Sequence, residues 1–210
     1  MIQAQEFQQI TQVSPEVLAL YNTWENMLTH WNKKINLVSP ATISQYWQRH
    51  ALDSHQLFNL APKAAKNWLD MGSGGGFPGL SIAINLKTAN AGGEVILVES
   101  VGKKCNFLRA VTRELNLPAR IVQARIENLP EEFVHSYDVI TARALAPLPK
   151  LLTYSAPFSD QDTIMIFPKG GHWEQELEAA QKYYRFTHNT ISSQTEESAK
   201  ILLVSNLDAL

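Results

Sequence analysis

The feature that most constrains the fold of this chain is a run of glycines between a predicted strand and a predicted helix. Five glycines fall within residues 72–79, directly after the apolar segment 68–71 and before the helical pattern of residues 78–86. Glycines at such a point let the backbone turn sharply and approach a ligand closely. The start of the helix offers free N–H groups to polar ligand atoms. The run therefore predicts a nucleotide-like ligand at the end of this strand.

The elements around this loop alternate between strands and helices. Helices are predicted at residues 78–86, 104–115, 148–154 and 172–183, and strands at residues 68–71, 94–98, 120–123, 138–141, 163–167, 186–191 and 201–204. Strands that alternate with helices pair in parallel, with helices on both faces of the sheet. We therefore predict a doubly wound α/β fold with a mostly parallel, seven-stranded sheet.

Residues 1–62 are predicted to form a helical extension packed on an α/β core of residues 63–210. Ser14 and Pro15 suit the N-cap and first position of a helix. A second helix is predicted over residues 43–60. The first helix carries an apolar stripe, which places Trp24 and Trp31 in the core rather than against nucleic-acid bases. The stripe comprises Val17, Leu20, Tyr21, Trp24, Met27, Leu28 and Trp31.

Composition narrows the class of protein further. The 210 residues are 45% hydrophobic, which suits a globular protein with a sizeable core. Apolar runs are far shorter than the roughly 20 residues of a membrane span, and the N-terminus lacks a signal-peptide pattern. Cys105 is the single cysteine, and His50 has no partner at ligand spacing, so neither a disulfide nor a metal site is predicted. A cytoplasmic monomer is the expected state.

The charge distribution is uneven although the net charge is only −2. Residues 103–125 carry six basic side chains and a single acid, Glu114. Such a patch suits an anionic partner such as RNA. A solvated helix face is the alternative interpretation.

The glycine loop fits two families of nucleotide-binding proteins. Gly74, Gly76 and Gly79 satisfy the dinucleotide fingerprint, and Glu99 ends the second strand where an acid would hold a ribose. Asp70 favours another family, because an acid-x-Gly-x-Gly-x-Gly loop resembles motif I of S-adenosylmethionine methyltransferases. In that motif the loop wraps the methionine part of the cofactor and the acid faces its amino group. A carboxylate there would oppose an anionic pyrophosphate.

Several further strings occur in a characteristic order. They are Trp31-Asn32-Lys33-Lys34-Ile35-Asn36-Leu37, Arg49-His50-x-x-Asp53-Ser54, the loop from Gly72 to Gly79, Glu99-Ser100-x-x-Lys103-Lys104-x-x-Phe107-Leu108, Ala124-Arg125-Ile126-Glu127, Ala142-Arg143-Ala144 and Pro168-Lys169-Gly170. Together they resemble the RsmG (GidB) family of class I, Rossmann-like methyltransferases. The resemblance implies an enzyme that uses S-adenosyl-L-methionine to methylate N7 of one guanine in 16S ribosomal RNA, in the 530 loop. The 16S rRNA or the small ribosomal subunit is then the expected partner.

The resemblance also implies the site residues. Glu99 should hold the ribose hydroxyls, Ile126 and Glu127 should flank the adenine, and Arg143 should orient the substrate. The full set of expected cofactor-binding residues is Asp70, Gly72, Ser73, Gly74, Phe77, Glu99, Ser100, Ile126, Glu127 and Arg143. The expected RNA-binding residues are Arg49, His50, Lys103, Lys104, Arg125 and Lys169.

Methylation at N7 is consistent with the residues that the chain lacks. Guanine N7 has a lone pair and no proton, so transfer needs placement and exclusion of water more than acid–base help. Methylation of a pyrimidine C5 needs a cysteine nucleophile, but Cys105 is predicted to lie in a helix far from the strand ends. Exocyclic amines are usually methylated beside an Asn/Asp-Pro-Pro-aromatic string, whereas residues 141–147 read Thr-Ala-Arg-Ala-Leu-Ala-Pro.

Some roles stay open at the level of sequence. Arg143 either donates to guanine O6 or forms a salt bridge with Asp70 or Glu127. Arg49, His50 and Asp53 share one face of the second helix, as an RNA-facing lid or as a cluster that docks the extension onto the sheet. Lys169 contacts phosphate or is a lone surface lysine.

Rival functions predict different behaviour. An NAD-dependent oxidoreductase needs a catalytic Tyr-Lys or His pair, and none is in place. A non-catalytic RNA- or ribosome-binding module would tolerate Gly72→Asp. A methyltransferase could also act on another RNA or a small molecule.

Overall fold

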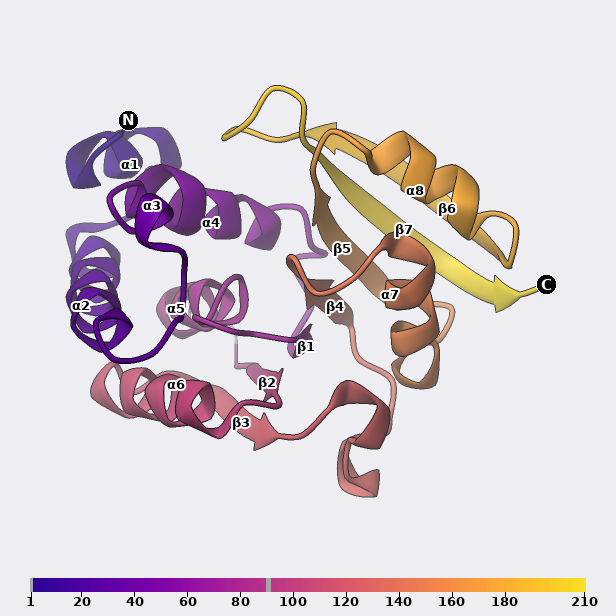
Figure 1. Cartoon of the computed structure of the whole chain (residues 1–210), viewed down its shortest axis with the longest axis horizontal. Coiled ribbons are helices and arrows are strands. Elements are labelled where there is room, and N and C mark those ends of the chain that lie inside the picture. The colour runs from indigo at the N-terminus through magenta and orange to yellow at the C-terminus, as the bar shows by residue number, and fades with distance from the viewer. Residues whose placement is uncertain (1, 90–91) are drawn as a thin grey trace.

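A single seven-stranded sheet forms the centre of the molecule (Figure 1). The structure is a computed structural model that describes residues 2–89 and 92–210. The strands are β1 (Asn67–Met71), β2 (Glu94–Glu99), β3 (Ala119–Gln123), β4 (Val139–Ala142), β5 (Ile164–Lys169), β6 (Tyr184–Ser192) and β7 (Lys200–Ala209). They lie in the order β3-β2-β1-β4-β5-β7-β6. The first five pair in parallel, and β7 runs antiparallel to both β5 and β6. The predicted α/β fold class is confirmed.

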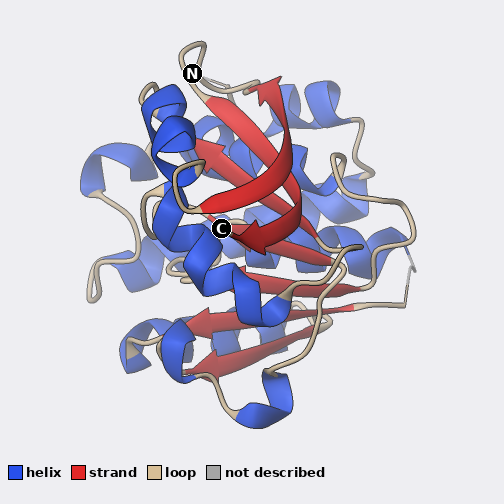
Figure 2. Ribbon diagram, turned by 90° about the vertical axis from the view of Figure 1, so that its right-hand side faces the viewer, coloured by secondary structure: helices blue, strands red, loops and turns tan. Residues whose placement is uncertain are grey.

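Helices cover both faces of the sheet (Figure 2). On one face lie α5 (Gly79–Ala89) and α6 (Gly102–Glu114), and on the other lie α7 (Leu148–Ser155) and α8 (Trp173–Ala180). Successive strand residues point to opposite faces, so Trp68 packs into one apolar core and Leu69 into the other. Short 3₁₀ turns occupy Ile126–Asn128, Glu131–Phe133 and Ala156–Phe158.

The N-terminal extension differs in detail from the prediction. Its elements are α1 (Ala4–Thr11), α2 (Pro15–Asn32), α3 (Pro40–Ile43), a π-helical segment (Tyr46–Leu52) and α4 (Asp53–Phe58). The Ser14 cap is confirmed, because its Oγ accepts from the Val17 N–H at 3.3 Å. The helical stretch predicted over residues 43–60 is confirmed over residues 46–58, but its first part is π-helical. The wider π-helical turns there bury His50 together with its aromatic neighbours, an arrangement that often marks functional sites.

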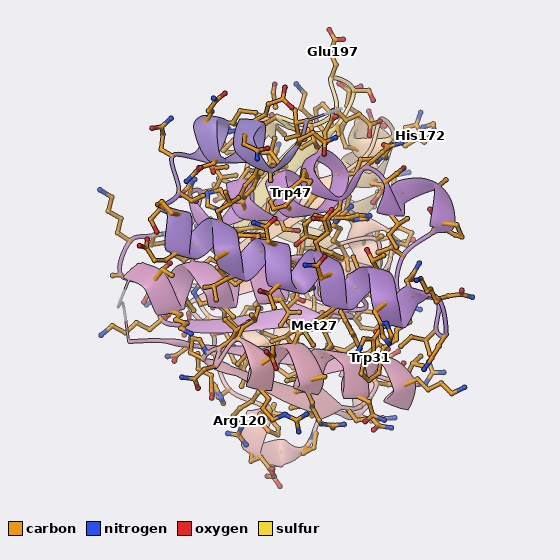
Figure 3. All side chains as sticks on the ribbon, turned by 90° about the vertical axis from the view of Figure 1, so that its left-hand side faces the viewer. Met27, Trp31, Trp47, Arg120, His172 and Glu197 are labelled. Atoms are coloured by element: carbon orange, nitrogen blue, oxygen red, sulfur yellow. The ribbon has the colours of Figure 1, made fainter. Side chains whose placement is uncertain are left out.

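The extension packs on the α5 and α6 face of the sheet. Phe7, Tyr21 and Trp24 are fully buried in the core that this face shares with α5. Met27 and Trp31 lie between α2 and α6 (Figure 3), and Trp31 packs edge-on against Phe107. The division of the chain at residue 62 stays a prediction, and residue 1 lies outside the described part. Within the described ranges, no helix has the length and apolar character needed to cross a membrane.

Candidate active site

The glycine loop turns sharply at the carboxyl end of β1. Gly72, Gly74 and Gly76 have φ values of +71°, +54° and +95°, which L side chains rarely adopt. The N–H groups of Gly72 and Ser73 both donate to the carbonyl of Val98, at 2.9 and 3.0 Å. The loop is therefore held against the end of β2. A Cβ added at Gly72 would lie only 2.7 Å from Leu145 Cδ1, so the Leu145 side chain would have to move to admit a side chain here.

Asp70 lies beneath the loop rather than inside the site. Its side chain is fully buried, with Oδ1 accepting from Thr141 Oγ1 at 2.8 Å and Oδ2 from the Gly79 N–H at 3.2 Å. Burial raises the pKa of this carboxyl to about 6. The expectation that Asp70 faces the cofactor's amino group is wrong. Side chains alternate along β1, so Asp70 points to the face that α5 covers and joins the start of α5 to β4.

A cavity of about 540 Å³ opens at the carboxyl ends of β1 and β2. Its walls come from the glycine loop, the ends of β2 and β4, the 3₁₀ turn after β3 and the N-terminal extension. All the expected cofactor residues except Asp70 line it, namely Gly72, Ser73, Gly74, Phe77, Glu99, Ser100, Ile126, Glu127 and Arg143. The fold thus brings together residues that lie up to 71 positions apart in the sequence.

Glu99 is fixed at the end of β2 by backbone donors. Its Oε2 accepts from the Gly74 N–H at 3.0 Å and its Oε1 from the Val101 N–H at 2.8 Å. A carboxylate oxygen can accept more than one hydrogen bond, so Glu99 retains capacity toward a ligand. The buried Cys105 donates its thiol to the Glu99 carbonyl at 3.1 Å. Cys105 thus lies close to a strand end, contrary to the prediction, but it does not line the cavity.

An aromatic stack joins the extension to the glycine loop. Phe77 lies between Trp24 and His50, with ring centroids 4.5 and 4.7 Å apart and interplanar angles of 23° and 27°. The position of the loop therefore depends on α2 and on the π-helical segment. Stacking against Phe77 is the feature that sequence analysis missed.

His50 is buried and neutral. Its Nδ1 accepts from Arg143 Nη1 at 3.4 Å, because a guanidinium can only donate. The ring proton then resides on Nε2, which is buried and has no partner among the described residues. Burial and the charge of Arg143 lower the pKa of His50 to about 3. With 6% of its surface exposed, His50 lines the cavity and is no surface RNA contact, which corrects that prediction.

Arg143 is held by three partners from the extension. Its Nε lies 3.1 Å from Asp53 Oδ2, its Nη2 donates to the Arg49 carbonyl at 2.7 Å, and its Nη1 donates to His50. The salt-bridge partner is thus Asp53, and neither Asp70 nor Glu127. Arg49, His50 and Asp53 therefore dock the extension onto the sheet. Three of the five guanidinium N–H groups have protein partners, which leaves two for a ligand.

Four of the six expected RNA-binding residues divide into two groups. Lys104 and Arg125 line the cavity and Lys103 is exposed beside it on α6. Lys169, in contrast, is 8% exposed, lies 2.8 Å from Glu176 Oε2 and donates to the Ala146 carbonyl at 2.9 Å. Lys169 is therefore neither a phosphate contact nor a lone surface lysine, the two roles that the sequence suggested.

Arg49 belongs to neither group. Its half-exposed side chain faces Glu196 at 3.6 Å.

Two observations fit an extended, polar ligand such as S-adenosylmethionine in this cavity. Gly72, Gly74 and Gly75 bring backbone without side chains to the cavity wall, and the buried His50 Nε2–H is a donor with no partner among the described residues. No group of three or more metal-ligating side chains occurs within residues 2–89 and 92–210.

The arrangement of the sheet and its loop is that of the class I methyltransferases. An O-methyltransferase from Bacillus cereus, solved with SAH, matches with a TM-score of 0.64 and 16% identity, covering 96% of each chain. A mutant of MtNAS in complex with S-adenosylmethionine matches with a TM-score of 0.56 and 16% identity, over 97% of this chain and 84% of that one. At such low identity these similarities establish the fold alone.

The sequence comparisons identify the family. The family model GidB, described as rRNA small subunit methyltransferase G, matches residues 18–202. Proteins named Ribosomal RNA small subunit methyltransferase G are similar throughout. The one from Parvibaculum lavamentivorans is 40% identical over 99% of this chain and 91% of its own, and that from Methylobacterium sp. is 44% identical over 93% and 91%. The chain belongs to the rRNA small subunit methyltransferase G family, and the resemblance found in the sequence is confirmed.

Proposed function

We propose that this protein transfers the methyl group of S-adenosylmethionine to N7 of a single guanine in small-subunit ribosomal RNA, the guanine of the 530 loop. Membership of the family supports a methyltransferase that acts on this RNA. The observation that carries the choice of N7 is the pair of groups on the cavity wall in which Arg143 offers two unused N–H groups and occupies the Nδ1 acceptor of His50.

The cofactor is held by groups that line the cavity at the carboxyl ends of β1 and β2, called the first cavity below. Glu99 keeps acceptor capacity for ribose hydroxyls beside its two backbone partners. Ile126 and Glu127 follow β3 and flank the adenine, and Glu127 is oriented by the Tyr154 hydroxyl, which donates to it at 2.8 Å. The methionine part lies against the glycine loop, where Gly72, Gly74 and Gly75 line the cavity. When bound, the cofactor supplies a methyl group already activated by its sulfonium charge.

The residues near this site suit an attack that needs no proton removal. His50 is a poor base because its pKa is about 3 and its Nδ1 already accepts from Arg143. Burial raises the pKa of the Cys105 thiol, which disfavours the thiolate that a nucleophile requires. Guanine N7 has a free lone pair, so alignment and exclusion of water supply most of the catalysis. Arg143 can donate to O6 while N7 stays free.

The surface beside the cavity favours a polyanionic substrate. Lys104 and Arg125 line the cavity, and Lys103 lies beside it on the exposed face of α6. Such cations contact phosphates and position RNA without reading its sequence. In this proposal the protein acts as a monomer, in the cytoplasm where ribosomal subunits assemble.

Methyl transfer to ribosomal particles tests the proposal. Labelled S-adenosylmethionine is incubated with small-subunit particles from cells that lack this protein, and the modified base is mapped. We expect label on one guanine N7 with the wild-type protein and none with Gly72→Asp, which puts a side chain into the glycine loop. Particles from wild-type cells, already methylated, should accept little label. Label on another atom or only on a small molecule would contradict the assignment of N7 in ribosomal RNA.

A further inference from the structure

A second cavity of about 450 Å³ adjoins the first. The two share only the segment of residues 143–145, which follows β4. The first cavity lies at the ends of β1 and β2, and the second lies at the ends of β4 and β5. Leu145, whose surface is 37% exposed, lies on the shared wall. An acceptor placed in the second cavity would therefore meet a methyl group from the first across this segment.

The far wall of the second cavity comes from the loop between β6 and β7, residues 193–199. This loop is anchored on the N-terminal extension. Thr195 Oγ1 donates to Asp53 Oδ1 at 2.8 Å, and the Gln194 N–H donates to Gln56 Oε1 at 3.0 Å. Glu197, in the same loop, extends away from the molecule at the top of Figure 3. The β6–β7 loop thereby completes the second cavity, whose other walls come from the extension and from the ends of the strands.

The same contacts position Arg143. Asp53 accepts from Thr195 on Oδ1 and pairs with Arg143 through Oδ2. Asp53 is therefore held on one side by the β6–β7 loop and holds the guanidinium on the other. Arg143 lines both cavities, so its two unused N–H groups lie where the ligands of both would meet.

The chemistry of the second cavity suits a base. Pro147 and Pro168 line it beside Leu145, and these side chains offer apolar surface to a planar ring. Polar groups are present as well. The Oε2 of Glu176 accepts from the Leu148 N–H and pairs with Lys169, while its Oε1 has no hydrogen-bond partner among the described residues. Guanine presents an acceptor at O6 beside N–H donors on its Watson–Crick edge, which matches guanidinium donors together with a carboxylate acceptor.

We propose that the second cavity receives the acceptor guanine, turned out of its RNA stack, and that Asp53 and Thr195 are positioning residues that hold Arg143 toward it. The inference rests on the proposed function and adds the place where the substrate binds. Enzymes that modify a base inside folded nucleic acid commonly extrude it into a pocket. The last forty residues, which carry no motif of their own, then contribute the wall that completes the substrate site.

Filling the second cavity tests the inference directly. Ala199 lines this cavity alone, so Ala199→Trp should obstruct it without touching the first. The matched control is Ala61→Trp, which fills a third cavity of about 380 Å³ near the end of the extension. We expect Ala199→Trp to lower kcat/KM for the RNA at least about tenfold. Calorimetry should show S-adenosylmethionine affinity within about twofold of wild type for both variants, which also reports that they fold.

A second variant separates positioning from folding. Thr195→Val removes the hydroxyl that donates to Asp53, and Thr190→Val is its control, because the Thr190 hydroxyl has no hydrogen-bond partner among the described residues. Thr195→Val should lower kcat about fivefold at saturating RNA and leave cofactor affinity unchanged, the expected cost of one hydrogen bond. Thr190→Val should match the wild type in both.

A photocrosslink locates the base independently of activity. RNA that carries 6-thioguanine at the target position is irradiated with the protein, and the attached peptide is identified. Crosslinks to residues 143–147 or 193–200 are expected. Attachment only to α6, or equal activity of the Ala199→Trp and Ala61→Trp variants, overturns the inference while leaving methyl transfer intact. If the wild-type protein methylates no guanine N7, both the proposed function and this inference are refuted.

Discussion

Substitution of Asp70 by asparagine should stabilise the protein at neutral pH. The carboxyl is fully buried, and burial raises its pKa from 3.8 to about 6. Each unit of pKa difference between folded and unfolded states corresponds to about 1.4 kcal/mol, so ionised Asp70 costs about 3 kcal/mol. Asparagine removes this cost and can keep both contacts, with Oδ1 accepting from the Gly79 N–H and Nδ2 donating to the Thr141 hydroxyl.

The sign of the pH dependence follows from the direction of the shift. Well below pH 3.8 Asp70 is protonated in both states and contributes no pH-dependent term. As the pH rises toward about 6, the unfolded chain releases the proton while the folded protein retains it, so stability falls. Above this range the full loss of about 3 kcal/mol is present. Most acids behave in the opposite way, because their pKa is lowered by folding.

Urea unfolding of the cofactor-free protein, followed by tryptophan fluorescence, measures the effect. The advantage of Asp70→Asn over wild type should approach about 3 kcal/mol near neutral pH and fall to about 0.5 kcal/mol near pH 4. Asp138→Asn is the control for the loss of one acidic charge, since Asp138 accepts from two backbone N–H groups at the opposite end of β1. An advantage that is independent of pH, or that grows in acid, would refute the reasoning.

Three further predictions concern the cofactor, the stack and the RNA. Gly72→Asp should weaken S-adenosylmethionine binding at least about 100-fold in calorimetry, because φ is +71° and the new Cβ meets Leu145 at 2.7 Å. An unchanged circular dichroism spectrum should show that the variant still folds. Retained binding would contradict the proposed role of the loop. Phe77→Ala should lower the free energy of unfolding by about 3 kcal/mol, since it empties the space between the Trp24 and His50 rings. A loss below about 1 kcal/mol in urea unfolding would show that the stack contributes little to the stability of the protein. Replacing Lys103 and Lys104 together by glutamine should weaken RNA binding and reduce the slope of log K against log salt by about 1.5, and an unchanged slope would place the RNA elsewhere.

The sequence by itself determined the elements of the α/β core and most of the residues that line the first cavity. The alternation of strands and helices, each of which follows from local periodicity, was sufficient to predict the doubly wound sheet. The glycine loop was predictable because positive φ values and missing side chains are local requirements of a tight turn. Glu99, Ile126 and Arg143 follow successive strands, and the carboxyl ends of parallel strands meet at one edge of a sheet. Their common placement therefore follows from sequence order.

Only the tertiary structure decided which partners these residues have. Asp70 was predicted to face the cofactor, but the register of β1 turns it beneath α5. His50 and Lys169 were predicted as RNA contacts, yet packing buries both. The pairing of Asp53 with Arg143 and with Thr195 spans 90 and 142 residues of sequence. Such contacts depend on how the extension and the β6–β7 loop pack over the sheet, and local periodicity carries no information about distances between separate layers.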